Sequence, residues 1–344
     1  MTEIHGGNLT AYPDYLDFSA NINPLGMPES VRQAVLDSAD DWSHYPDPAC
    51  TRLVHAISEH GNFPADQIVC GNGAADLIYR VASAFRPQCA VVCAPTFSEY
   101  ETALQSVGCK VTHYLLRETC GFRLQPDILE MLTPETDILF LCTPNNPTGL
   151  RIEPDLLREI TEKCRTEHIL LICDECFLDF TDDAKAYSLC TCMIPDSIIL
   201  KAFTKIYAIP GLRLGYACCG TPEIANRLRQ SGQYWSVSVP AQAAGIAALL
   251  ESAYVRRTVR YIADARKALS DQLRKCGLRV YPSDANFLLL KTDKRFAENM
   301  KQHRILVRSC ANFIGLSDSH FRIAVRTVRE NAALIRAVRE VYGT

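Results

Sequence analysis

The chain has 344 residues, a formal net charge of −3 and a sequence pI of about 6.3. Because no block of like charges stands out, the sequence argues against nucleic acid and membrane surfaces as partners and favours small molecules. The length exceeds the roughly 250–300 residues at which a single core stops growing, so we expect two domains.

The N-terminus lacks the basic start and apolar run of a signal peptide, and no stretch approaches the ~20 apolar residues of a membrane span, so we expect a cytoplasmic protein. In that reducing compartment the 16 cysteines, scattered through apolar strand-like runs, are expected to be free buried thiols. Cys173 and Cys176 have CxxC spacing, but a structural zinc site needs a second pair, and Cys190 with Cys192 has the wrong spacing. We therefore expect no metal.

Short apolar runs alternate with amphipathic stretches between about residues 65 and 220. This alternation predicts a mostly parallel α/β sheet with helices on both faces, whose ligand binds at the carboxyl ends of the strands. The predicted strands are 68–71, 89–94, 110–116, 137–142, 169–175, 197–202 and 212–220, and helices are predicted at 74–85, 98–107 and 154–164.

Residues from about 238 to 275 predict one long helix, because apolar residues recur at helical spacing and no breaker precedes Gly277. Short strands at 286–291, 305–309 and 321–325 and a closing helix at 329–342 predict a smaller α+β domain. We expect residues 31–240 to form the large domain. Residues 1–30 and 241–344 are then expected to form a small domain that closes over the active site.

Polar residues follow several predicted strands directly: TPNNPTG at 143–149, Asp174, the pair Thr204 and Lys205, and GNGAADLIY at 71–79. Each of these features has an ordinary alternative, since Asp, Asn, Pro and Gly favour turns and most lysines are exposed. Lys205, however, is followed by Gly211 and Arg213 around a rigid IPG turn, which its neighbour Lys201 lacks at the same offsets.

A pyridine aldehyde phosphate would suit these residues. Its phosphate needs backbone N–H groups at a helix start, offered by Gly73 and Ala74, and a hydroxyl and a cation, offered by Thr204 and Arg213. Its ring nitrogen needs a carboxylate that keeps it protonated, and its aldehyde needs an amine of lowered pKa. Asp174 and Lys205 match those two needs.

The order of Asn146, Asp174, Lys205 and Arg322 resembles that of the fold-type I pyridoxal-phosphate aminotransferase superfamily over nearly the whole chain. Within it the sequence resembles histidinol-phosphate aminotransferases and, more closely, L-threonine O-3-phosphate decarboxylases. That second resemblance rests on HGGN at 5–8, DFSANINPLG at 17–26, HYPDP at 44–48, TKIYAIPGLRLGY at 204–216 and FRIAVR at 321–326. It implies an α/β fold with a mostly parallel seven-stranded sheet in the large domain.

The resemblance also implies residue roles. Asn146 should bond the O3′ of pyridoxal 5′-phosphate, Phe97 should stack on its ring, and Tyr45 should reach the cofactor phosphate of a neighbouring subunit. The last role implies a homodimer with shared active sites.

Substrate roles follow in the same way. Arg322 should grip the substrate carboxylate, while Arg308, Asn21 and His5 should meet its phosphate end. The alternatives are surface salt bridges for the two arginines and a solvated histidine near the terminus.

Three positions depart from the family pattern. Phe177 stands where many relatives have a tyrosine on O3′, which leaves Asn146 to act alone. Ala202 stands where a serine or threonine often touches the phosphate, which leaves Thr204 to do so, and Ala74 is unusual but still offers its backbone N–H.

The resemblance implies decarboxylation of L-threonine O-3-phosphate to (R)-1-amino-2-propanol O-2-phosphate in cobalamin biosynthesis. A histidinol-phosphate-type aminotransferase is the alternative, and a non-catalytic pyridoxal-phosphate-binding regulator is a third hypothesis. Both reactions share the cofactor and differ in which bond of the substrate α-carbon stands perpendicular to its ring. The sequence supplies residues but no torsion angles, so it leaves these hypotheses open.

Overall fold

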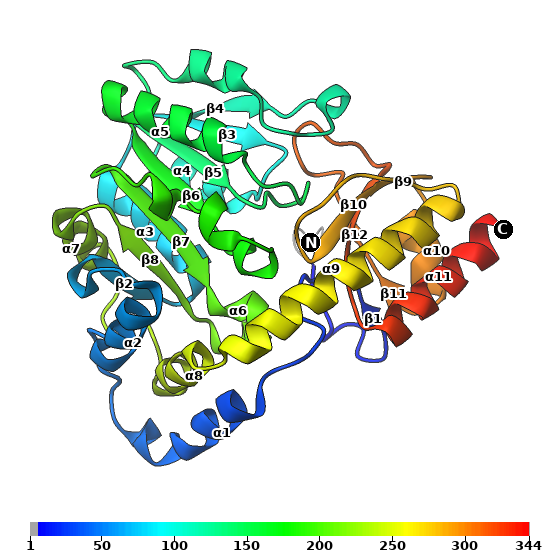
Figure 1. The fold of residues 1–344 in the computed structure, drawn as a ribbon, viewed down its shortest axis with the longest axis horizontal. Coiled ribbons are helices and arrows are strands. Elements are labelled where there is room, and N and C mark those ends of the chain that lie inside the picture. The colour runs from blue at the N-terminus through cyan, green and yellow to red at the C-terminus, as the bar shows by residue number, and fades with distance from the viewer. Residues whose placement is uncertain (1–5, 344) are drawn as a thin grey trace.

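The computed structural model describes residues 6–343 and contains a seven-stranded sheet with the order β2-β8-β7-β6-β5-β3-β4, seen on the left of Figure 1. All seven predicted strands are confirmed. Six are apolar runs largely buried in this sheet, whereas β4, at one end of the strand order, has mainly exposed and half-buried side chains. The strands are β2 Ile68–Gly71, β3 Cys89–Ala94, β4 Lys110–Leu115, β5 Ile138–Cys142, β6 Leu170–Asp174, β7 Ser197–Ala202 and β8 Gly215–Cys219.

Strands β3 to β7 run parallel, whereas β8 is antiparallel to both of its neighbours, β2 and β7. The chain leaves β7 at Ala202 and re-enters the sheet at Gly215, and these two residues are register partners. Residues 203–214 therefore begin and end at one edge of the sheet, which is the edge where a ligand is expected.

Helices cover both faces of this sheet, as the alternating pattern predicts. Apolar side chains of α3 (Gly73–Phe85), α4 (Glu99–Ser106) and α7 (Pro222–Gln230) bury against one face. Those of α2 (Thr51–Gly61), α5 (Pro154–Glu167) and α8 (Val239–Leu249) bury against the other, where α8 also packs on α1 (Glu29–Asp37). The fold-type I α/β prediction is confirmed.

A second, smaller body stands beside the large sheet in Figure 1. Its four-stranded sheet has the order β12-β13-β10-β9 and packs with α9, α10 and α11 around a separate core. The elements are β9 Arg279–Val280, β10 Phe287–Lys291, β12 Arg308–Ser309, β13 His320–Ala324, α9 Ser252–Lys275, α10 Phe296–Gln302 and α11 Val328–Tyr342. The boundaries predicted at residues 31 and 241 stay a prediction.

Two predicted elements in the C-terminal third of the chain are wrong in extent. The long helix of 238–275 is two helices, α8 and α9, which separate at Leu250 and Glu251, where ψ of Glu251 is 42°. They bury against different partners, so the chain turns without a glycine or proline. The predicted strand 305–309 is also two strands: β11 (Ile305–Leu306) pairs with β1 (Leu16–Asp17), whereas β12 pairs with β13.

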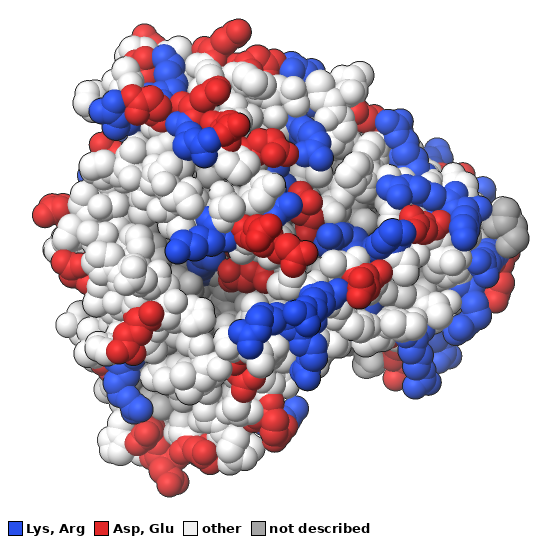
Figure 2. Space-filling view, viewed as in Figure 1, with Lys and Arg blue, Asp and Glu red and all other residues white. Residues whose placement is uncertain are grey.

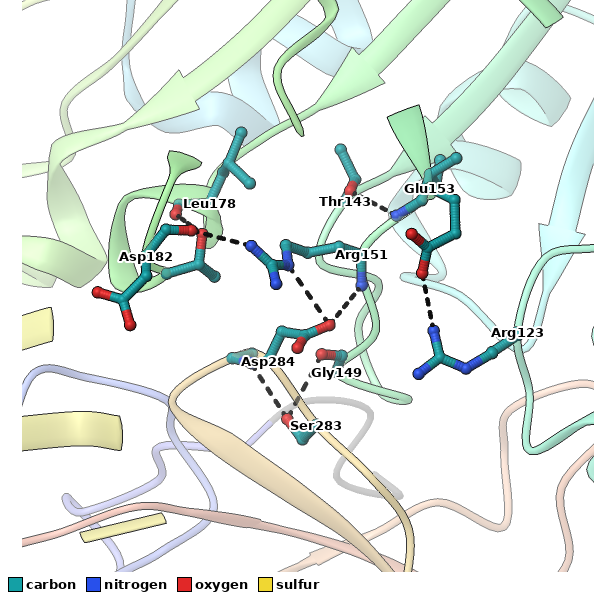
Figure 3. Close-up of polar contacts among 12 residues, drawn as sticks. Arg123, Thr143, Gly149, Arg151, Glu153, Leu178, Asp182, Ser283 and Asp284 are labelled. Carbon is teal, nitrogen blue, oxygen red and sulfur yellow. Dashed lines mark hydrogen bonds and ion pairs between the residues drawn. The ribbon is translucent and has the colours of Figure 1, made fainter. Parts of the chain in front are cut away.

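The loop after β5 is tied to the small body by the contacts drawn in Figure 3. The backbone N–H of Asp284 donates to the Gly149 carbonyl at 2.7 Å, and the Arg151 N–H donates to the Asp284 carboxylate at 3.1 Å. A second Arg151 contact, from Nη1, reaches the Asp182 carbonyl at 2.9 Å. The segment that carries Asn146 therefore touches both bodies.

All 16 cysteines are free thiols, and Cys173 and Cys176 are both buried, as predicted. The prediction that all are buried is wrong for Cys190, which is exposed, and for Cys89, Cys120 and Cys192, which are half-buried. Within residues 6–343 no group of three or more His, Cys, Asp or Glu side chains is arranged to hold a metal ion. Nor does any helix in that range combine the length and apolar character that crossing a membrane requires.

Candidate active site

A cavity of about 380 Å³ lies where the carboxyl ends of the central strands meet the small body. Many of the residues predicted for the site line it: Asn21, Ala74, Phe97, Asn146, Asp174, Thr204, Lys205, Arg213, Arg308 and Arg322. Gly73 lies directly beside Arg213, as described below. Tyr45 lies outside the cavity, and His5 lies outside the described residues.

Lys205 reaches the cavity from α6 (Phe203–Ile206), the single helical turn that follows β7. Its half-buried amine has no hydrogen-bond or ion-pair partner among residues 6–343. Burial, together with the nearby charges of Arg322 and Arg213, lowers the pKa of Lys205 from 10.5 to about 8. At pH 7 roughly a tenth of the amine is then neutral and nucleophilic, a far larger share than at the ordinary pKa of 10.5.

Lys201 has the opposite surroundings. Its amine contacts the Asp179 carboxylate at 3.0 Å and the Glu175 carboxylate at 3.7 Å. Although burial opposes its charge, these carboxylates hold the pKa of Lys201 well above its ordinary value. Lys201 is an ion-paired strand residue. This agrees with the sequence argument that Lys205, and not Lys201, is the reactive lysine.

Asp174 is the last residue of β6, and its buried carboxylate faces the cavity. One oxygen accepts a 2.6 Å hydrogen bond from the Tyr100 hydroxyl, and the other accepts the Cys176 backbone N–H at 2.9 Å. Both donors fix the orientation of the carboxylate. The sequence reasoning missed Tyr100, although its position three residues after Phe97 in an amphipathic stretch was a usable signal.

The predicted phosphate end lies where α3 begins. Gly73 has φ +81°, and a Cβ there would stand 2.6 Å from the Arg213 Nη2 atom. A Cβ at Gly215 would stand 2.6 Å from the Ala74 backbone nitrogen. These two glycines let β8 and the Arg213 guanidinium approach the first turn of α3 closely. The buried side chain of Thr204 lies in the same cavity.

Arg322, in β13, closes the opposite side of the cavity. Its guanidinium donates to the Asn146 side-chain oxygen and, at 2.7 Å, to the Ser19 backbone carbonyl. With its amide oxygen turned inward, Asn21 accepts from the same guanidinium at 3.3 Å. Burial lowers the pKa of Arg322 to about 10, so it stays charged at neutral pH, with no carboxylate bonded to it in the described chain.

Arg308 stands directly across from Arg322 in the register of β12 and β13. Its guanidinium contacts the Asn312 side-chain oxygen at 2.9 Å and lies 5.5 Å from the Phe313 ring centre. Two buried cations therefore face one cavity, which suits a ligand with two anionic groups.

Phe177 lines the cavity and packs edge-to-face on Phe287 at 5.0 Å, so its position offers no hydroxyl to a ligand. Ala202 also lines the cavity and leaves Thr204 as the neighbouring hydroxyl. Phe177 and Ala202 thus line the same cavity as Asn146 and Thr204, the residues that we expected to act in their place.

Tyr45 lies on the surface, 77% exposed, and stacks on Trp235 with ring centres 4.2 Å apart. Trp235 has φ +56°, and Trp42 and Tyr234 are also exposed large aromatic side chains. Within one chain none of these four residues lines the cavity.

The donor set of the cavity fits pyridoxal 5′-phosphate. The amine of Lys205 without an acidic partner suits the aldehyde, and the buried Asp174 carboxylate suits the ring nitrogen. Thr204, Arg213 and the start of α3 would hold the phosphate. The cavity volume of about 380 Å³ leaves room for a small substrate as well.

Comparison with known proteins gives consistent results. The family model described as aminotransferase class I and II matches residues 13–338. The chain is 41% identical to the threonine-phosphate decarboxylase of Salmonella typhimurium, over 98% of this chain and 96% of that protein. It is 29% identical to the solved histidinol-phosphate aminotransferase of Clostridium acetobutylicum, with TM-score 0.89, covering 95% and 99% of the chains. The solved Sinorhizobium meliloti histidinol-phosphate aminotransferase with pyridoxal-5′-phosphate shares the fold at 22% identity, TM-score 0.85, over 97% and 93%.

Proposed function

Since the chain belongs to the aminotransferase class I and II family and is a pyridoxal-phosphate-dependent enzyme, we propose that it decarboxylates L-threonine O-3-phosphate. The product would be (R)-1-amino-2-propanol O-2-phosphate, a precursor in cobalamin biosynthesis. The relative at 41% identity over nearly the full chain supports this proposal.

The observation that carries the proposal is the pair of buried arginines beside the Lys205 amine. Arg308 and Arg322 are register partners on adjacent strands, and both guanidinium groups line the cavity. A phosphorylated amino acid has two anionic groups, a carboxylate and a phosphate, which these two cations match. We propose that Arg322 binds the carboxylate and that Arg308 with Asn21 binds the phosphate.

Bound pyridoxal phosphate supplies the electron sink for the bond that breaks at the substrate α-carbon. Asp174, held by Tyr100, would keep a proton on the ring nitrogen. Asn146, whose side-chain oxygen accepts from Arg322, lines the same cavity and would bond O3′ through its amide nitrogen. Lys205 is the candidate proton donor to the α-carbon after CO₂ leaves, because its pKa of about 8 permits both charge states near neutral pH.

An aminotransferase acting on histidinol phosphate is the second candidate. The Clostridium acetobutylicum structure supports it through a TM-score of 0.89, although the 29% identity is lower than that of the decarboxylase relative. In that reaction Lys205 would remove the α-proton instead. The two candidates therefore use the same residues and differ in the orientation of the substrate.

We also propose a homodimer in which Tyr45 reaches the partner's cofactor phosphate. The exposed rings of Tyr45, Trp235 and Tyr234 support this, because they contact one another and large exposed apolar groups that gather on one surface favour an interface. Trp42 is exposed as well. We further propose that each subunit consists of a large domain, residues 31–240, and a small domain, residues 1–30 and 241–344.

The test is to mix cofactor-loaded protein with L-threonine O-3-phosphate, without a keto acid, and to follow CO₂ release and the cofactor absorbance. Sustained CO₂ release with the starting spectrum restored is expected. Absence of CO₂, with histidinol phosphate instead converting the cofactor to its pyridoxamine form, would establish the aminotransferase.

A further inference from the structure

A second cavity, of about 540 Å³, lies on the face of the sheet covered by α2 and α8. Strands β7 and β8, the end of α2, residues 184–190 and the start of α9 form its walls. Ala202 lines both this cavity and the active-site cavity, so the two lie back to back across the end of β7. The proposed reaction uses none of its polar groups.

Two tyrosine hydroxyls in this cavity lack partners. Tyr207 is only 6% exposed, and within residues 6–343 its hydroxyl makes no hydrogen bond. The partly buried Tyr216 hydroxyl is likewise unbonded among the described residues. Neither hydroxyl is among the buried unbonded polar atoms of the described residues, so both are open to a molecule that enters the cavity.

The charges around this cavity favour an anion. Lys185 and Arg256 are exposed, line the cavity and form no ion pair within the described part of the chain. The carboxylate that lines it, Asp179, is already paired with Lys201 at 3.0 Å. In Figure 2 a band of Lys and Arg side chains follows α9 across this face of the molecule. An anionic group at the mouth would meet two cations that no carboxylate of residues 6–343 pairs with.

The walls favour a flat apolar body. The aromatic rings of Phe63 and Phe203 line the cavity together with Leu249 and Val255. A pocket that is mostly apolar with a few convergent polar groups is the usual form of a small-molecule site.

We propose that this cavity binds a small organic anion with a flat apolar body and acts as an effector site. Tyr207 directly follows α6, the turn that carries Lys205, and its backbone N–H donates to the Phe203 carbonyl at 3.2 Å. A molecule that bonds the Tyr207 hydroxyl therefore acts on the same short segment that positions the reactive amine.

The test uses cofactor-loaded protein and the probe 2-naphthalenesulfonate, with the neutral 2-naphthalenesulfonamide as comparison, by isothermal titration calorimetry. The double variant Lys185→Ala/Arg256→Ala is expected to weaken sulfonate binding about tenfold and to leave the sulfonamide unchanged. Tyr207→Phe is expected to weaken both probes about three- to tenfold. Arg260→Ala is the matched control, because Arg260 is exposed on α9 but does not line the cavity.

Equal sulfonate affinity in the wild type and the Lys185/Arg256 variant would overturn the proposal, as would undiminished binding to Val255→Trp, which fills the cavity. The effector role is tested by a separate measurement, a pH titration of the absorbance of the bound cofactor. Its midpoint depends on the surroundings of Lys205 and can be measured without knowing the substrate. A saturating probe is expected to shift this midpoint in the wild type and not in Val255→Trp. An unchanged midpoint in both would refute the effector role.

Discussion

Lys201 and Lys205 are separated by a single helical turn, yet their amines have opposite surroundings. Lys201 is bonded to carboxylates, whereas Lys205 lies near two arginines and has no acidic partner among residues 6–343. The folded-state pKa of Lys205, about 8, lies below its ordinary value of 10.5. Between these values the unfolded chain binds more protons, so this residue makes stability rise with pH through that window.

We therefore expect cofactor-free Lys205→Met to be more stable than the wild type at pH 7. The half-buried position keeps the expected gain at about 1–3 kcal/mol, since the buried charge is removed. Above pH 10.5 the two proteins should converge. Urea unfolding of both at several pH values measures this difference, and a constant gap across the window would contradict the assigned cause.

Tyr100 is the buried donor to Asp174, so Tyr100→Phe should weaken the control of the ring nitrogen. We expect about a tenfold fall in kcat, with a smaller change in cofactor affinity, because one hydrogen bond to a charged group is lost. Tyr114→Phe is the control, since Tyr114 is also a buried tyrosine bonded to an aspartate, Asp127, but lies outside the cavity. Equal losses in both variants would point to a general stability effect.

At the scale of single residues the sequence located much of the cavity. Asp174, Asn146 and Lys205 follow buried strands, and parallel strands bring their carboxyl ends to one edge. Tyr100 was missed because its spacing from Phe97 places it near the site, but a tyrosine in an amphipathic helix looks like a core residue until the partner of its hydroxyl is known. The Ser19 carbonyl was missed because backbone acceptors leave no mark on the sequence.

Among the elements, β8 shows what a hydrophobic pattern omits. The run 212–220 predicted a buried strand, but its direction depends on the short connection from β7, and nothing in an apolar run encodes direction. The split of α8 from α9 was missed for a related reason. Both halves are amphipathic or apolar, and only their different packing partners turn the chain.

The close contact of β8 with α3 yields a prediction for these elements. A Cβ at Gly215 would collide with the backbone of Gly73 and Ala74, so Gly215→Ala should push α3 away from the predicted phosphate position. We expect cofactor affinity to fall about tenfold or more. Gly211→Ala is the matched control, because no atom lies within 4 Å of a Cβ at that position. Spectrophotometric titration with pyridoxal phosphate measures both, and equal affinities would contradict the assignment.

At the scale of the whole molecule, the active-site cavity is shared between the large sheet and the small body, with Lys205 on one and Arg322 on the other. The contacts of Gly149 and Arg151 with residues 283–284 tie the two bodies together beside Asn146. The sequence predicted both bodies from their patterns, but not these contacts, because the turn at 283–284 is far from the loop in sequence.

The proposed dimer makes a prediction at the same scale. If Tyr45 completes the partner's site, Tyr45→Ala should weaken cofactor binding about tenfold although the residue lies outside its own cavity. Mixing Tyr45→Ala with Lys205→Ala subunits should then restore activity, since one hybrid site keeps both groups. Sedimentation equilibrium should show a dimer for each variant. A monomeric wild type, or mixtures that stay inactive, would reject the shared site.

Because β8 runs antiparallel to β7, the segment that connects them should tolerate no insertion. Residues 203–214 connect two strand ends that pair with each other in the sheet. The amine of Lys205 and the guanidinium of Arg213 therefore lie on one short connection with fixed ends. Surface loops elsewhere can lengthen at little cost, since closure entropy grows slowly with length. Here an inserted residue would change the spacing of the two cations, so this segment should have a fixed length in any functional descendant of the sequence.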